Sequence, residues 1–108
     1  MADAEQAGRL QLDLNNEVFQ ENWLTLDKSE RNRVTDTLRK LRQFTWEQLY
    51  RDRGLKWEKV VSVKPPHGID AVYTLRSTQS RRATAYRDRN FLRLLMIAPD
   101  HDTVYGEK

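Results

Sequence analysis

Two arginines lie where they could hold a phosphate group between them. Arg76 lies near the end of one predicted strand and Arg82 near the start of the next, and the connecting loop runs over residues 78–80. Strand alternation then places the two guanidinium groups opposite each other on one face of a sheet. Like charges at such a position are destabilising, and a bound anion would remove the repulsion. The alternative is an ordinary solvated face that binds no ligand.

A histidine and two tyrosines could complete the groups needed to cut RNA. In the metal-free reaction the 2′-OH attacks its own phosphate, so the site needs a base, an acid and positive charge. The imidazole of His101 suits either proton transfer, whereas arginine stays charged and can hold two phosphate oxygens. Tyr86 or Tyr105 could stack on an unpaired base. The alternative for His101 is a surface position without a chemical role, and His67 is expected to be structural.

The sequence predicts no metal site and no cofactor. Asp100, His101 and Asp102 are consecutive, and consecutive side chains of an extended chain point in opposite directions. No further histidine completes a ligand set, and the chain has no cysteine. Either aspartate could instead orient the imidazole.

The arginines belong to a predicted antiparallel meander. Its three strands are rich in Val, Thr, Tyr, Leu and Ile, are separated by polar turns and cover residues 70–77, 81–88 and 91–99. Alternation puts Ala83 and Ala85 on a buried face, and Arg82 and Tyr86 on the other, which Arg93 is expected to share. On the third strand the expected buried positions are Leu92, Leu94, Met96 and Ala98.

The N-terminal half is predicted to supply a strand and a helical hairpin. Alternating leucines indicate a strand at residues 10–14, and Asn15 or Asn16 could cap the helix that follows. The second helix begins near Asp27 or Ser29. The apolar positions of the two helices are Phe19, Trp23 and Leu26, then Val34, Leu38 and Leu41. Residues 44–50 extend the second helix or form a short third one, and residues 55–63 form a loop or an irregular edge strand. The expected fold class is α+β, with a flexible leader at 1–9 and one domain over 10–108.

Charge is distributed unevenly along the 108 residues. The net charge is +3, but residues 1–24 carry five acids and one base, whereas the remainder carries eighteen bases and eleven acids. The basic part favours a polyanionic partner, either nucleic acid or an acidic protein segment. No secretory signal is visible, and the longest apolar run, residues 94–98, is too short to span a bilayer. With no cysteine, a cytoplasmic location and no membrane partner are expected.

This order of elements resembles the RelE/ParE superfamily of bacterial toxins. LQLDL followed by VFQENWLTL and a basic helix looks like the first strand and helical hairpin of that family. The segment from Tyr73 to Tyr105 looks like its core pattern, in which a Leu-Arg strand end leads through a tight turn to an arginine strand. The His101 to Tyr105 ending looks like the aromatic ending of the family. The resemblance covers roughly residues 10–105.

The resemblance implies a function and a set of site residues. Many members cleave mRNA, often in the ribosomal A site, and are held inactive by a cognate antitoxin protein. By this resemblance Arg82 would neutralise the scissile phosphate, His101 would act as general acid or base, and Tyr105 would stack or assist proton transfer. The expected RNA-binding residues are Arg76, Arg93, Tyr86 and Lys59. Lys56, Glu58 and His67 match no family position well enough to receive a role.

The leading hypothesis is a metal-independent mRNA endoribonuclease of the RelE type that works with the ribosome. Another branch of the superfamily inhibits DNA gyrase, so a second hypothesis is a binding module without catalysis that engages gyrase, RNA or a protein. A third is an inert protein that retains the fold.

Overall fold

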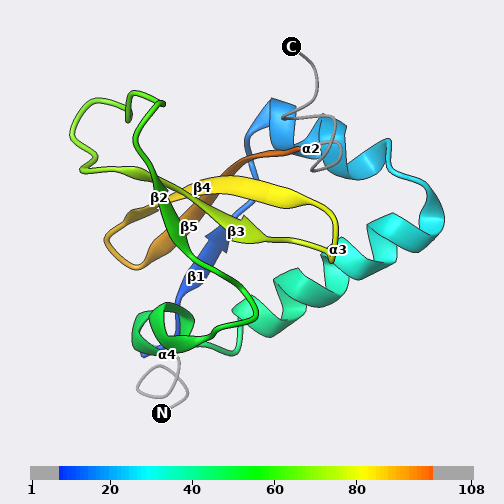
Figure 1. Cartoon of the computed structure of the whole chain (residues 1–108), viewed down its shortest axis with the longest axis horizontal. Helices are drawn as coiled ribbons and strands as arrows, with labels where there is room; N and C mark the ends of the chain where they lie inside the picture. Colours follow the sequence, from blue (N-terminus) through cyan, green and yellow to red (C-terminus); the bar gives the residue numbers. More distant parts are fainter. Residues whose placement is uncertain (1–7, 99–108) are drawn as a thin grey trace.

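The computed structural model describes residues 8–98, which form one five-stranded sheet and three helices (Figure 1). In chain order the elements are β1 (Gln11–Asp13), α2 (Glu17–Leu24), α3 (Lys28–Leu41), α4 (Trp46–Arg51), β2 (Glu58–Val60), β3 (Val72–Arg76), β4 (Arg82–Asp88) and β5 (Phe91–Ile97). The predicted α+β class is confirmed. Within residues 8–98 no helix is long and apolar enough to cross a membrane.

The strand order in the sheet is β1-β5-β4-β3-β2. β1 pairs with β5 in parallel, and every other pair is antiparallel. Between β3 and β4 the predicted register is confirmed, because Leu75 faces Ala83 and Arg76 faces Arg82. The hairpin closes where the backbone N–H of Ser77 donates to the carbonyl of Arg81 at 3.0 Å.

A bulge in β5 overturns part of the predicted burial pattern. Ala85 pairs with Leu94 but Thr84 pairs with Met96, so Leu95 is an extra residue in the ladder. Alternation is shifted by one residue beyond this point. Ile97 is therefore in the core, whereas Met96 is 39% exposed. The prediction that Met96 and Ala98 line the buried face was wrong.

Side-chain caps define where each helix begins. Asn16 accepts from the backbone N–H of Val18 at 2.8 Å, and Asp27 accepts from that of Glu30 at 2.9 Å. Of the two alternatives for each of these helices, Asn16 and Asp27 are thus the caps. Thr45 and Gln48 form a capping box, which starts α4 as a separate short helix.

The core lies between the helices and one face of the sheet. Phe19 of α2, Leu41 of α3 and Leu49 of α4 are fully buried. They pack in one cluster with sheet residues that include Ala83 and Ala85. Trp23, expected in the core, is partly buried against this cluster, and its Nε1 donates to Thr35 at 3.3 Å. The helices thus cover one face of the sheet, and the other face is left for the site.

The connections around β2 resolve the remaining alternatives. Residues 55–63 contain an edge strand, but only Glu58–Val60 pair with β3. Gly68, in the proline-containing loop, has a φ of 83°, as its type predicts. The proposed leader lies mostly outside the described residues, and the carbonyl of Arg9, its last residue, accepts a hydrogen bond from Asn90 at 2.6 Å.

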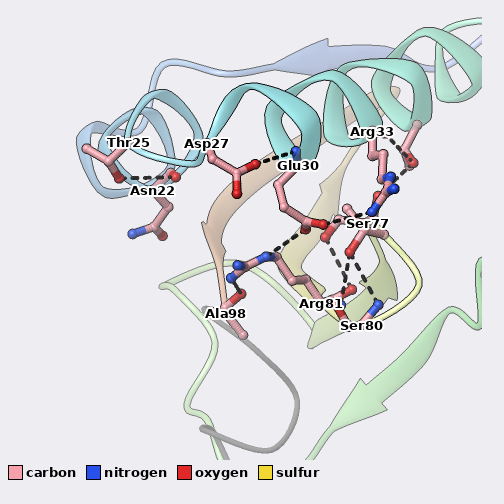
Figure 2. A network of polar contacts seen from close by, with 11 residues as sticks. Asn22, Thr25, Asp27, Glu30, Arg33, Ser77, Ser80, Arg81 and Ala98 are labelled. Carbon is pink, nitrogen blue, oxygen red and sulfur yellow. Dashed lines mark hydrogen bonds and ion pairs between the residues drawn. The ribbon is translucent and has the colours of Figure 1, made fainter.

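A partly buried ion pair joins α3 to the sheet (Figure 2). Arg81 Nε donates to Glu30 Oε1 at 2.9 Å, and Arg81 Nη1 donates to the carbonyl of Ala98 at 3.4 Å. Glu30 also accepts from Arg33 at 3.0 Å. The side chains of Arg81 and Glu30 are only 20% and 18% exposed. This network fixes the β3–β4 hairpin and the end of β5 against the helix.

A second ion cluster joins three neighbouring strands, β1, β5 and β4. Arg93 of β5 donates to Asp13 of β1 and, at 3.0 Å, to Asp88 of β4. The pKa of Asp13 is lowered, chiefly because the backbone N–H of Asn15 donates to its carboxylate at 3.0 Å, and also because Arg93 lies beside it. The ionised carboxylate is therefore more stable in the folded protein than in the unfolded chain.

Removal of the Glu30 charge should destabilise the fold. In Glu30→Gln the partly buried Arg81 loses its counter-charge, so we expect the free energy of unfolding to fall by about 1–3 kcal/mol. Glu47→Gln is the matched control, because the Glu47–Arg51 pair is exposed and such pairs contribute about 0–1 kcal/mol. Urea unfolding of both variants measures the difference, and equal losses would contradict this account.

The stabilisation by Asp13 should depend on pH. A lowered folded-state pKa stabilises the fold above the ordinary value of 3.8, and this stabilisation is lost as pH falls through the folded-state pKa. We expect the gap in unfolding free energy between wild type and Asp13→Asn to be largest near neutral pH and to shrink below 3.8. Urea titrations across this range test it, with the exposed Asp36→Asn as control. A gap that does not change with pH would refute the assignment.

Candidate functional site

A cleft of about 870 Å³ lies on the face of the sheet opposite the helices. β2, β3, β4, the β3–β4 hairpin and the end of β5 form its walls. Five of the residues that line it are basic and one is acidic: Lys56, Lys59, Arg76, Arg81 and Arg82, against Glu58. The cleft is therefore strongly cationic, which favours an anionic ligand.

Arg82 is held rigidly in this cleft. Its Nε and Nη2 donate to Thr74 Oγ1 at 3.1 and 2.8 Å, and Nη2 also donates to the carbonyl of Lys56 at 2.7 Å. The carboxylate of Glu58 lies 3.7 Å from Nη2 but is largely exposed, so the pair is weak. These contacts fix the guanidinium plane without using all of its donors.

The remaining nitrogen of Arg82 is available to a ligand. Nη1 makes no hydrogen bond with any residue from 8 to 98. A terminal guanidinium nitrogen carries two N–H groups. Arg82 can thus bind an oxyanion without giving up the contacts that position it.

Arg76 supplies a second cation directly across the hairpin. It faces Arg82 in the register of β3 and β4, and its backbone N–H donates to the carbonyl of Leu55 at 2.7 Å. Its side chain makes no ion pair with any residue from 8 to 98. Like charges at facing positions repel each other, the exposed Glu58 compensates Arg82 only weakly, and a phosphate between the two arginines would be stabilised by both.

The loop before β2 contributes through its backbone. Lys56 has a φ of 50°, a left-handed conformation that is unusual for a residue with a side chain. The carbonyl of Lys56 in this conformation accepts from Arg82. Sequence reasoning missed this contact, since a positive φ at lysine has no signal in the sequence. Thr74 could have been found, because alternation places it on the same face as Arg76.

Lys59 lines the cleft by its position on the edge strand, but its side chain points elsewhere. It pairs with Tyr73, whose ring is on the helix side of the sheet. Alternation along β2 therefore directs Glu58 toward the cleft and Lys59 away from it. Arg81 also lines the cleft, and its charge is balanced by Glu30.

The other predicted site residues do not meet in the cleft. Arg93 and Tyr86 face each other in the β4–β5 register and do not line the cleft, and the charge of Arg93 is balanced by Asp13 and Asp88. His101 and Tyr105 lie outside the described residues. The structure thus brings Arg76 and Arg82 together, and no metal-binding cluster of His, Cys, Asp or Glu occurs between residues 8 and 98.

Comparisons with known proteins give one likeness. No family model and no curated protein matches the chain. Among solved structures, a copper-bound mutant toxin from Helicobacter pylori is similar with a TM-score of 0.47 and 19% sequence identity, over 89% of this chain and 99% of that one. A likeness of this size assigns the chain to no family.

Proposed function

We propose that this protein is a RelE-type toxin that cuts mRNA without a metal ion and binds the scissile phosphodiester in the cleft. The observation that carries the proposal is the facing pair Arg76 and Arg82 in a cationic cleft. The sequence resemblance supplies the reaction. In this proposal a cognate antitoxin with an acidic segment covers the cleft, and the ribosome presents the mRNA in the cytoplasm.

Arg82 acts on the charge that develops during the reaction. As the 2′-oxygen attacks, negative charge grows on the non-bridging oxygens of the phosphorane. A donor that is already oriented stabilises this charge without reorganising. The contacts of Arg82 with Thr74 and Lys56 supply that orientation, and Nη1, which no residue from 8 to 98 binds, supplies the donor. Arg76 adds a second positive charge from the neighbouring strand.

Proton transfer is assigned to His101, with Tyr105 assisting or stacking. The support for His101 is the position of Ala98, the last of the described residues. Ala98 lines the cleft, and its backbone N–H donates to the carbonyl of Arg82 at 2.8 Å. Only three peptide units separate Ala98 from His101, and they reach at most about 11 Å. A tether of this length allows the imidazole to reach the cleft, as the proposal requires.

Cleavage should depend on the arginine and the histidine together. Primer extension on mRNA in a translating extract is expected to show new cuts with wild type. Loss of a preorganised charge donor typically lowers the rate by about 10²–10³, and loss of a general acid or base by about 10²–10⁴. We expect Arg82→Ala and His101→Ala to fall in these ranges. Arg39→Ala, at an exposed position on α3 outside the cleft, is the control and should cut normally.

The same assay decides against the proposal in two ways. No new cuts with wild type would exclude the nuclease, as would unchanged cutting by the Arg82→Ala, His101→Ala double variant.

A binding module without catalysis is the second candidate, and the observation that favours it is the composition of the cleft. Its described lining includes Lys56, Arg76 and Arg82 and no histidine, so it can bind an anion without an imidazole for proton transfer. In this case growth inhibition should survive His101→Ala but fail on charge reversal of Arg76 and Arg82. A gyrase supercoiling assay tests the version in which gyrase is the target.

A further inference from the structure

A row of aromatic rings lies on the other side of the sheet from the cleft. Trp57 stacks on Tyr73 with ring centroids 4.5 Å apart and an angle of 12° between the planes. Tyr50 and Trp46 of α4 lie 6.4 and 5.7 Å from Trp57. We name these four residues the aromatic cluster. Trp46 belongs to the core, whereas Tyr50 is 51% exposed and Trp57 and Tyr73 are partly exposed.

The polar tips of the cluster remain available. Trp57 Nε1 and the Tyr73 hydroxyl make no hydrogen bond within residues 8–98, and both residues are partly exposed. In contrast, Trp46 Nε1 donates to the carbonyl of Asn90 at 3.3 Å. The rings are only partly buried, and two of their hydrogen-bond donors are not used within residues 8–98. Such a surface fits a ligand that offers flat rings and hydrogen-bond acceptors.

Cations surround the cluster. The guanidinium of Arg87 lies 4.5 Å from the Trp46 ring centroid, and its Nη1 donates to the Tyr50 hydroxyl at 2.9 Å. Lys59 faces Tyr73 across the β2–β3 ladder and is exposed. The nearby carboxylates Glu47 and Asp52 already pair with Arg51 and Lys40. The charge that is left unbalanced beside the rings is positive.

From this juxtaposition we propose that the aromatic cluster binds single-stranded nucleic acid, with unpaired bases stacked on Tyr50 and Trp57 and phosphates held by Lys59 and Arg87. Stacking on aromatic rings beside cations is how proteins bind single strands of varied sequence. An acidic protein segment would satisfy the cations but would make no use of the flat rings. The site is separate from the cleft and does not depend on cleavage.

The position of the cluster suggests how one strand could reach both faces. Lys56 lines the cleft, and the next residue, Trp57, belongs to the cluster. The cleft and the aromatic cluster thus lie on opposite faces of the same edge of the sheet, next to β2. A single strand that crosses this edge would place a phosphate near Arg82 while an adjacent base stacks on Trp57.

Tryptophan fluorescence tests the stacking directly. In a Trp23→Phe background the signal comes from Trp46 and Trp57, which are both in the cluster. A short oligodeoxythymidylate is the probe, because it has no 2′-OH and cannot be cut by the proposed reaction. We expect quenching on binding, and at least about fivefold weaker binding in Tyr50→Ala. Lys59→Gln should also weaken binding and should reduce its salt dependence.

The controls separate stacking from simple charge attraction. Leu24→Ala, at an exposed apolar position of α2, should bind as the parent does. Arg82→Ala should keep the same quenching at saturation, since the cleft lies on the other face. Heparin, a polyanion without bases, should produce little quenching. Equal quenching by heparin, unchanged binding in Tyr50→Ala, or loss of quenching in Arg82→Ala would each overturn the proposal. A protein that cuts no RNA but passes these tests would refute only the nuclease.

Discussion

The burial of two alanines in the central strand is the constraint on which the rest of the structure depends. Ala83 and Ala85 are 2% and 0% exposed, and they face the helices. Because side chains alternate along a strand, their burial forces Arg82 and Thr84 to the opposite face. A slip of one residue would drive Arg82 into the core at a prohibitive desolvation cost. The same packing that forms the core therefore selects which charges line the cleft.

The arginines of the sheet divide into two groups by their electrostatic environment. Arg81 is balanced by Glu30, and Arg93 by Asp13 and Asp88, so these two join elements of the fold. Arg82 has only the exposed Glu58 nearby, and Arg76 has no ion-pair partner within residues 8–98. Sequence alone cannot separate the groups, since all four arginines lie in or directly beside the strands of the meander. The separation comes from carboxylates that are distant along the chain.

What could be predicted from the sequence follows from local rules. The β3–β4 register and the opposition of Arg76 and Arg82 depend only on alternation and a short loop, and both were predicted correctly. The bulge at Leu95 was missed, because the sequence of β5 alone does not show where an extra residue interrupts its pairing with β4. That error misplaced Met96 and Ala98, and with them one wall of the cleft.

Long-range contacts account for the rest. Arg81 and Glu30 are 51 positions apart, and Arg93 and Asp13 are 80 apart, so no motif in the sequence links them. The support of Arg82 by a lysine carbonyl required a left-handed residue that no propensity indicates. The aromatic cluster was likewise invisible, because its members come from α4, the segment before β2, and β3. The residue types indicated that an anion could be bound, but the contacts that position these residues are visible only in the folded structure.

The parallel pairing of β1 with β5 has a consequence for synthesis. Gln11 pairs with Phe91, which is 80 positions later, so this ladder joins two segments that are made at well separated times during translation. Loop closure of this length is slow, and contacts of high sequence separation delay folding. A growing polypeptide cannot finish the sheet until β5 has left the exit tunnel.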